Sequence, residues 1–222
     1  MNRRMFLTLP PLAAPLLLRA PLFAAGPSLP LPRQRIDCFG RHWLVQEAAE
    51  WKTEAAAGGE VLQLSVARPQ EANPRAPVQY ALLEHEPAGC FTLDVEVQGS
   101  AASTSLIIVY AWKDPLHFNY VHLSTDTAQE QPVHNGVFHV YGGDRVRISN
   151  DEGPRSLADA LKWTPVRIVY NASKGLVETS IDGRKNPSLR AADFSLGAGR
   201  IGLGSFFNTG SFRKFELRPG AC

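Results

Sequence analysis

The sequence predicts an all-β fold, a two-sheet antiparallel β-sandwich of about a dozen strands with little helix. Three observations predict it. Short runs of alternating apolar and polar residues recur along the chain, as is typical of strands with one buried face. Turn-forming residues separate these runs, and Asp182-Gly183 is the strongest hairpin signal. Only two short stretches, 48–57 and 156–161, could form helices.

The individual strands follow from the apolar pattern. The clearest is 91–97, where Phe91, Leu93 and Val95 alternate with polar residues. The expected strands span 41–45, 61–66, 78–83, 91–97, 105–112, 118–123, 137–141, 145–148, 166–170, 177–181, 200–206 and 212–217. Two long polar loops, 124–136 and 150–162, interrupt this series. Long loops in a compact sandwich are often functional, and the alternative is that they are tolerated surface insertions.

Residues 1–26 are predicted to be a twin-arginine-type export signal. Arg3 and Arg4 are followed, after one residue, by Phe6 and Leu7, and prolines and Arg19 then interrupt an apolar stretch. These breaks argue against a transmembrane helix, which needs about 20 continuous apolar residues. An ordinary secretory signal is the alternative. Either signal predicts a periplasmic or secreted protein, with a Pro-rich linker at 27–35 and a single sandwich domain at 36–222.

The charge balance changes when the signal is removed. The full chain has 23 Lys and Arg against 21 Asp and Glu, and the signal takes away Arg3, Arg4 and Arg19. The remaining net charge of about −1 lacks the basic excess of a nucleic-acid-binding protein. We expect no nucleic-acid partner and no membrane association once the signal is removed. The sequence carries no signal for an oligomeric state.

Three cysteines, Cys38, Cys90 and Cys222, allow one disulfide in an oxidising compartment. The alternative is three unpaired small apolar side chains. No Cys-x-x-Cys or mixed Cys/His spacing is present, so zinc is not expected. We predict no cofactor.

The C-terminal half resembles the concanavalin A-like, laminin-G-like jelly-roll superfamily, near the exported keto-disaccharide hydrolase-type domains. The resemblance covers about residues 91–218. It rests on the stretches 163–170 (WTPVRIVY), 175–183 (GLVETSIDG), 196–206 (LGAGRIGLGSF) and 210–215 (GSFRKF). It implies a jelly-roll β-sandwich. Its members include carbohydrate-binding modules, glycoside hydrolases and polysaccharide lyases, so it specifies the fold better than the function.

The resemblance also bears on the cysteines and on metal. First and last strands commonly pair in jelly rolls, which favours a Cys38–Cys222 disulfide. Calcium at a rim loop occurs in this fold class, but the loop acids make no recognisable calcium motif and we do not predict the ion. These acids are Asp126, Glu130, Asp151 and Glu152.

Four successive strands between 105 and 148 are predicted to carry a decorated face. One parity of each strand is largely aliphatic and is assigned to the core: Ile107, Val109, Ala111, Val121, Leu123, Phe138, Val140, Val146 and Ile148. The other parity is aromatic or basic: Tyr110, Trp112, Phe118, Tyr120, His122, His139, Tyr141, Arg145 and Arg147. Alternate side chains of a strand lie on opposite faces, so the second set would share one side of a sheet.

This chemistry predicts a carbohydrate ligand. Aromatic rings stack on the C–H faces of sugars, and arginine recognises carboxylates in bidentate fashion, which suits an acidic sugar. The predicted ligand-binding residues are Tyr110, Trp112, His134, Asn135, His139, Tyr141, Arg145 and Arg147. The alternative is that the aromatic rings cap the sheet beneath a loop and the arginines are solvated charges.

Tyr120 and His122 are the candidate catalytic pair if the protein is an enzyme. They lie two residues apart on one strand face, and with Arg145 and Asn135 they could support β-elimination on a uronic acid. The Gln-x-His pattern of alginate-lyase-like jelly rolls and the Glu-x-Asp-x-x-Glu strand of family-16 glycoside hydrolases are both absent. The leading expectation is therefore an exported carbohydrate-binding domain, with a lyase or glycoside hydrolase as the alternative and a protein-interaction domain as the third.

Gly199, Gly202 and Gly204 leave one face of the strand 200–206 nearly bare. Such a face marks the close approach of a ligand or of another backbone. The alternative, close packing of a loop or bend, is the favoured interpretation.

Overall fold

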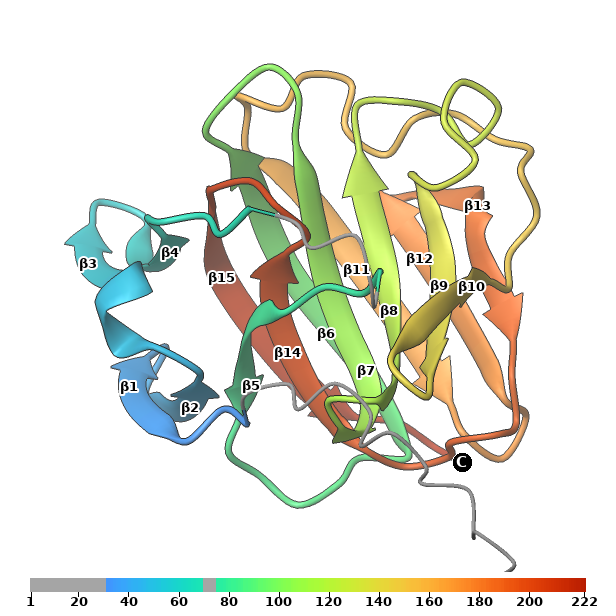
Figure 1. Cartoon of the computed structure of the whole chain (residues 1–222), viewed down its shortest axis with the longest axis horizontal. Helices are drawn as coiled ribbons and strands as arrows, with labels where there is room; N and C mark the ends of the chain where they lie inside the picture. Colours follow the sequence, from blue (N-terminus) through green and yellow to red (C-terminus); the bar gives the residue numbers. More distant parts are fainter. Residues whose placement is uncertain (1–30, 70–74) are drawn as a thin grey trace, which may run out of the picture.

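Two antiparallel sheets packed face to face make up the fold (Figure 1). The computed structural model describes residues 31–69 and 75–222. The predicted export signal at 1–26 and the linker residues before 31 lie outside the described residues. The predicted all-β sandwich is confirmed. No helix in the described part of the chain is long and apolar enough to cross a membrane.

The larger sheet has eight strands in the order β1-β2-β5-β14-β7-β8-β9-β10. Its strands are β1 Gln34–Cys38, β2 Arg41–Val45, β5 Gln79–Leu83, β7 Ser105–Asp114, β8 His117–Ser124, β9 Gly136–Tyr141, β10 Asp144–Arg147 and β14 Arg200–Ser205. The strands β7 to β10, where the decorated face was predicted, are consecutive neighbours from β7 to the free edge at β10. The predicted shared face requires these four strands to be neighbours, and they are.

The smaller sheet has seven strands in the order β13-β12-β11-β6-β15-β4-β3. They are β3 Trp51–Ala56, β4 Gly59–Leu64, β6 Cys90–Gly99, β11 Thr164–Asn171, β12 Leu176–Ile181, β13 Arg184–Ala192 and β15 Gly210–Pro219. The β12–β13 hairpin turns through Asp182 and Gly183, both with positive φ. The hairpin predicted from Asp-Gly is thus confirmed.

The main core fills the space between the sheets, because each strand there directs apolar side chains inward. Its largest fully buried members include Trp43, Phe91, Tyr110 and Phe212. β6 shows the expected pattern most clearly: Phe91, Leu93 and Val95 are buried, while the residues between them are partly exposed.

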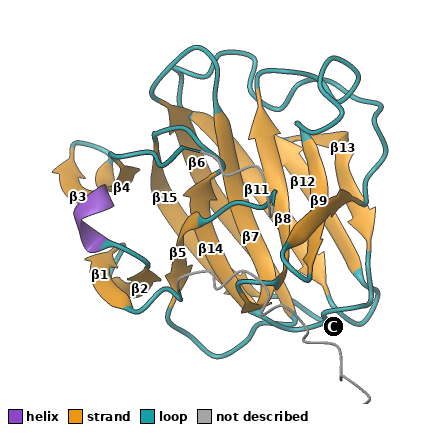
Figure 2. Cartoon of the chain, in the orientation of Figure 1, coloured by secondary structure: helices purple, strands orange, loops and turns teal. Residues whose placement is uncertain are grey.

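Three strands were not predicted. β1 begins at Gln34, inside the predicted linker. The predicted helix 48–57 is a short 3-10 helix, η1 Ala48–Glu50, followed by strand β3 (Figure 2). β13 was not predicted because Pro187 interrupts its strand pattern. β13 is an edge strand, and edge strands tolerate proline. The stretch 156–161 forms turns and no helix.

Backbone packing explains the glycines of β14. A Cβ on Gly204 would lie 2.3 Å from the carbonyl oxygen of Gln79, and one on Gly202 would lie 2.9 Å from that of Ala81. Both contacts are with the neighbouring strand β5. The bare parity of β14 therefore permits close approach of a neighbouring strand, and not of the loop or bend that was the favoured interpretation.

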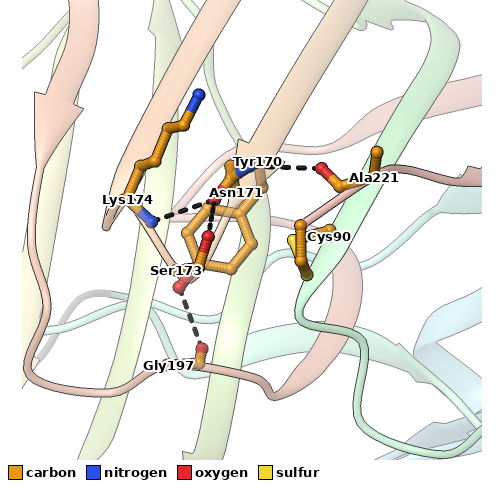
Figure 3. Close-up of a disulfide and its surroundings, with 8 residues drawn as sticks. Cys90, Tyr170, Asn171, Ser173, Lys174, Gly197 and Ala221 are labelled. Atoms are coloured by element: carbon orange, nitrogen blue, oxygen red, sulfur yellow. Dashed lines mark hydrogen bonds between the residues drawn. A yellow bond between two sulfur atoms is a disulfide. The ribbon is translucent and has the colours of Figure 1, made fainter.

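The disulfide joins Cys90 to Cys222, so the predicted Cys38–Cys222 pairing is wrong (Figure 3). The first and last strands do not pair: β15 lies between β6 and β4, and β1 is at the edge of the other sheet. Cys90 begins β6, and Asn171 of β11 donates a hydrogen bond to the carbonyl oxygen of Ala221 (Figure 3). Cys38 is buried and unpaired, and burial, followed by the charge of Glu60, raises its pKa to about 12.

A second hydrophobic core covers the outer face of the eight-stranded sheet. It is built on β7, β8, β9 and β5, and the segment 75–78 passes across it before entering β5 (Figure 1). Ala76 of this segment is buried in that core. Both faces of the large sheet are therefore apolar. For this reason an apolar side chain in its strands does not by itself show which face it lies on.

Candidate functional site

Strand β8 places three predicted side chains on the outer face of the large sheet. Phe118, Tyr120 and His122 lie there, while Val121 and Leu123 point into the main core. The parity predicted for this strand is confirmed. All three outward side chains are nevertheless fully buried, so the face is a packed layer and not an open groove over β8.

β7 is inverted relative to the prediction as far as Tyr110, and a bulge at Ala111 then returns Trp112 to its predicted face. Ala111 has a φ of 52° and lies where the pairing with β14 shifts register. Tyr110 packs in the main core in phase with Ile108. Because Ala111 is the extra residue of the bulge, Trp112 lies on the outer face and donates a hydrogen bond to the Tyr80 hydroxyl at 3.2 Å. The placement of Tyr110 on the decorated face was wrong. Ile107 and Val109 occupy that face instead, because the strand is apolar on both parities.

Strand β9 is inverted relative to the prediction. Phe138 is the partner of Tyr120 across the β8–β9 pair, and cross-strand partners share a face. Phe138 and Val140 are thus on the outer face, and His139 and Tyr141 are on the opposite face. Phe138 was assigned to the core between the sheets because it is apolar, but the outer face of the sheet is apolar as well.

Arg145 lies where the outer face reaches the sheet edge. Its guanidinium carbon is 4.9 Å from the centre of the Phe138 ring and 4.2 Å from that of Phe206. Its Nη1 atom donates a hydrogen bond to the Tyr120 hydroxyl at 3.0 Å. We call these four residues the Arg145 site. The geometry is that of a cation held by aromatic faces.

The Arg145 guanidinium is half-buried and forms no ion pair with a carboxylate of the described residues. Arg167 and Arg213, by contrast, pair with Asp94 and Glu96 on the other sheet. A guanidinium has five N–H donors in a fixed fork, and the Tyr120 hydroxyl accepts from one of its nitrogens. The remaining donors make this group able to bind an anion.

Arg147 has a different role, although it shares the parity of Arg145. It donates hydrogen bonds to the carbonyl oxygens of His134 and Asn135, each at 2.9 Å, and to that of Asn150 at 2.7 Å. Burial lowers its pKa despite the charge of Asp151. Its donors hold the two long loops in place.

Asn135 also holds these loops together. Its side-chain nitrogen donates to the Pro154 carbonyl at 3.1 Å, and its side-chain oxygen accepts from the Ser156 backbone at 2.8 Å. The side chain is fully buried. Its polar atoms are thus engaged inside the protein and do not face a ligand.

His134 lies at the rim, beside the buried His122. Their ring centres are 5.2 Å apart, and Nδ1 of His134 is 2.9 Å from a carboxylate oxygen of Asp126. The His134 side chain remains 18% exposed. The loop residue predicted to close over the face therefore reaches its edge.

His122 is a buried neutral imidazole. Its Nε2 atom is 2.5 Å from the Ser105 hydroxyl, and its ring stacks on Phe206 with centres 5.6 Å apart. Nδ1 has no hydrogen-bond partner among the described residues. Burial lowers the pKa of His122 well below its usual value, and the nearby Arg145 lowers it further.

Tyr120 is equally enclosed. Burial raises its pKa above the usual value, and the contribution of Arg145 in the opposite direction is smaller. A protonated, buried phenol whose hydroxyl already accepts from Arg145 is not placed as a base. Tyr120 and His122 lie close together, with ring centres 6.0 Å apart, but neither presents a free functional atom at the surface.

Three residues around the site were not predicted from the sequence: Phe206, Phe207 and Ser105. Phe206 contacts both Arg145 and His122, and Phe207 lies between Phe206 and His134. Phe206 could have been found: Ile201 and Leu203 point to the core, so the alternate positions 202, 204 and 206 face outward. In residues 31–69 and 75–222, no three His, Cys, Asp or Glu side chains gather closely enough to hold a metal ion.

Comparison with known proteins identifies the fold. No protein-family model matches the chain, and no curated protein matches it. The carbohydrate-binding module CBM66 of Bacillus subtilis is a similar solved structure, with a TM-score of 0.57 and 13% identity over 79% of this chain and 94% of that one.

Two further structures are similar. One is a Parabacteroides distasonis protein provisionally described as a glycosyl hydrolase, with a TM-score of 0.54 and 13% identity over 78% of this chain and 92% of that one. The other is the GH43 protein BlXynB of Bacillus licheniformis, with a TM-score of 0.50 and 11% identity over 79% of this chain and 35% of that one. The chain therefore has the concanavalin A-like jelly-roll β-sandwich fold that its C-terminal half predicted.

Proposed function

We propose that this protein is an exported carbohydrate-binding module that recognises an acidic sugar at the Arg145 site. One observation carries the proposal. The Arg145 guanidinium lies against the rings of Phe138 and Phe206 and has no carboxylate partner in the described structure. The ligand would supply that carboxylate.

The chemistry of the site favours a uronic acid. The fork of an arginine matches a carboxylate in bidentate geometry. The flanking aromatic rings exclude water, which strengthens the ion pair. At the rim, Phe207 offers an apolar face and His134 a polar group to the rest of the sugar. A neutral hexose would leave the guanidinium without its counter-charge.

The similarity to CBM66 supports the ligand class, because the match covers nearly all of a protein that is itself a carbohydrate-binding module. The shared fold alone does not transmit that function. The Arg145 site supplies the chemical argument within this chain.

Export is the second part of the proposal. It rests on the twin-arginine pattern of residues 1–26, followed by the linker and a single domain that would act in the periplasm or outside the cell. The Cys90–Cys222 disulfide supports it, since structural disulfides persist mainly in oxidising compartments. Replacing Arg3 and Arg4 by lysine should retain the protein in the cytoplasm, and unchanged export would favour an ordinary secretory signal.

The geometry gives less support to the two alternatives. A lyase using Tyr120 and His122 would need both groups at the substrate, yet both are fully buried. A protein-interaction domain would need an exposed apolar patch, but the aromatic face is packed beneath the segment that includes Ala76. We therefore favour carbohydrate binding over β-elimination by Tyr120 and His122 and over protein interaction.

A glycan array tests the proposal. The probes are tetraglucuronate, tetramannuronate and tetragalacturonate, with cellotetraose, mannotetraose and galactotetraose as neutral counterparts. We expect the protein to bind at least one acidic probe and Arg145→Ala to lose about 10- to 100-fold in affinity for it, since a hydrogen-bonded charge contributes about 1.5–3 kcal/mol. Val169→Ala, an exposed change on the other sheet, is the matched control. Unchanged acidic binding in Arg145→Ala, or no acidic binding by the wild type, would refute the proposal.

A further inference from the structure

His139 and Tyr141, which the sequence grouped with Arg145, lie on the opposite face of the same hairpin. In the β8–β9 pair, Tyr141 is the partner of His117 and His139 is the partner of Asn119. Cross-strand partners share a face, so these four side chains form one patch. It is separate from the Arg145 site, because the sheet lies between them.

This patch is open to solvent at Tyr141 and His117, whereas Asn119 is buried and the His139 side chain is 12% exposed. Tyr141 is 68% exposed, and Val146, the partner of His139 in β10, is 57% exposed. In the middle of the sheet, the same face is buried against the smaller sheet, for example at Val137. We call the exposed patch of His117, His139, Tyr141 and Val146 the Tyr141 shelf.

The Tyr141 ring is held by two neighbouring rings and is otherwise mostly exposed. It stacks on His139 with ring centres 5.8 Å apart and an interplanar angle of 19°, and the His117 ring meets it edge-on at 4.9 Å. Since 68% of the Tyr141 side chain is exposed, part of the ring surface remains available for stacking, and we call that part the free face. An exposed tyrosine held by two neighbouring rings loses little further freedom when a ligand binds.

Both imidazoles of the shelf are oriented by acceptors behind them. Nδ1 of His117 is 2.9 Å from a carboxylate oxygen of Asp114. Nδ1 of His139 is 2.7 Å from the Asn119 amide oxygen and 3.3 Å from a carboxylate oxygen of Asp193. A carboxylate can only accept, so each Nδ1 carries a hydrogen, and the Nε2 atom is an acceptor whenever the ring holds only that hydrogen.

From this arrangement we propose that the Tyr141 shelf is a second carbohydrate site, one that takes a neutral sugar. A pyranose ring stacks on the free face of Tyr141, and its hydroxyls donate to the Nε2 atoms of His117 and His139. The ligand class rests on the proposed function, whereas the site and its preference for an uncharged sugar are independent of Arg145.

The preference for a neutral sugar follows from the charges around the shelf. Asp114 and Asp193 stand behind the two imidazoles, and no described arginine or lysine pairs with either. Burial alone would raise the pKa of Asp193, but hydrogen bonds from Asn119 and Ser195 lower it below the usual value. An ionised carboxylate at this position disfavours a uronic acid.

The same glycan array tests the shelf, with Tyr141→Ala, Tyr141→Phe and Arg145→Ala compared with the wild type. We expect the wild type to bind at least one of cellotetraose, mannotetraose and galactotetraose. Tyr141→Ala should weaken that binding about tenfold or more, because it removes the stacking face. Tyr141→Phe keeps the ring and should stay within about twofold of the wild type. Since Tyr141 is exposed, neither change should affect folding.

Two outcomes would overturn the inference: no binding of any neutral probe by the wild type, or neutral binding that survives Tyr141→Ala. Arg145→Ala separates the two proposals. If Arg145→Ala loses binding to the acidic probes and keeps binding to the neutral ones, both sites are supported. If it keeps binding to the acidic probes, the Arg145 site is contradicted, and the effect of Tyr141→Ala on neutral binding still tests the Tyr141 shelf.

Discussion

At the residue scale, Arg145 and Arg147 show how neighbours decide a role. Both side chains leave β10 on the same face. Arg147 meets the carbonyl oxygens of His134, Asn135 and Asn150, which accept its hydrogen bonds. Arg145 meets rings and one hydroxyl. Sequence parity predicted their common side, but only the three-dimensional neighbours separate a structural arginine from a candidate receptor.

His122 predicts a loss of stability in mild acid. Its pKa in the folded protein is well below the usual value, so below about pH 6.5 the unfolded state binds the proton and the folded state does not. Stability is therefore complete above that pH and falls as the pH decreases. The free energy of unfolding should therefore be measurably lower at pH 5 than at pH 7.

Urea unfolding of the wild type and His122→Gln at about pH 7 and pH 5 checks this prediction. The variant should lose most of that pH-dependent difference, whatever its absolute stability. His85, whose pKa burial also lowers, is present in both proteins, so its contribution cancels. An equal difference in both proteins would show that His122 is protonated in the folded state.

At the element scale, the bulge in β7 determines which aromatic residues reach the outer face. Gly199 lies against it: a Cβ there would be 2.2 Å from the Ala111 carbonyl carbon and 2.5 Å from the Trp112 nitrogen. Both are backbone atoms, which cannot rotate away. The bulge and the glycine therefore require each other.

We accordingly predict that Gly199→Ala destabilises the protein by about 2–4 kcal/mol, since overpacking against backbone forces the strands apart. Thermal unfolding measures the loss. Gly89→Ala is the control, because a Cβ at Gly89 meets its nearest neighbour, the Ala198 Cβ, at an ordinary 3.5 Å. Equal melting temperatures for Gly199→Ala and the wild type would contradict the tight packing at the bulge.

For β7 and β9 the sequence predicts the position of the strand but not which of its faces points to the main core. The positions of both strands were predicted closely, because alternation and turn residues are local signals. Their faces were not, because parity distinguishes inside from outside only when one face is polar. Here the outer face is a second core. β8 was assigned correctly because His122 marks one parity and Val121 and Leu123 mark the other.

The two long loops form one structure through their mutual contacts. Asn135 of the first bonds to Pro154 and Ser156 of the second, and Arg155 pairs with Glu130 across them. Their length was visible in the sequence, but these contacts join residues about 20 positions apart and follow no periodic pattern. They bring His134 to the rim of the Arg145 site.

At the scale of the whole molecule, the disulfide closes a loop of 132 residues. Chain-entropy arguments give such a crosslink up to about 5 kcal/mol, and removal of native disulfides typically costs about 2–5 kcal/mol. Cys222→Ser should therefore lower the melting temperature by roughly 10 °C for a domain of this size, and added reductant should have no further effect on it.

Cys38→Ala is the matched control for that measurement. Cys38 is buried and unpaired, so this variant should keep the sensitivity of the wild type to reductant. If Cys38→Ala loses its sensitivity to reductant, the Cys38–Cys222 pairing predicted from the sequence would be supported instead.

The sandwich itself was predictable because it follows from local alternation summed over the chain and from the 163–215 stretches. The disulfide partner was not, because it depends on the order of strands within each sheet. Cys90 and Cys222 meet where β6 begins and the chain ends after β15, and these two strands are neighbours. Strand order is set by long-range pairing, which no single-sequence pattern encodes.

The central claim, that Arg145 binds a sugar carboxylate, is tested most directly by a thermodynamic cycle. Calorimetric titration would compare Tyr141→Ala, which lacks the second proposed site, with the double variant Tyr141→Ala/Arg145→Ala, using the acidic tetrasaccharide that binds most tightly and its neutral counterpart. We predict that loss of the ligand carboxylate weakens binding to Tyr141→Ala about 10- to 100-fold and has little effect on binding to the double variant. An equal loss in both proteins, or no preference of Tyr141→Ala for the acidic ligand, would contradict the claim.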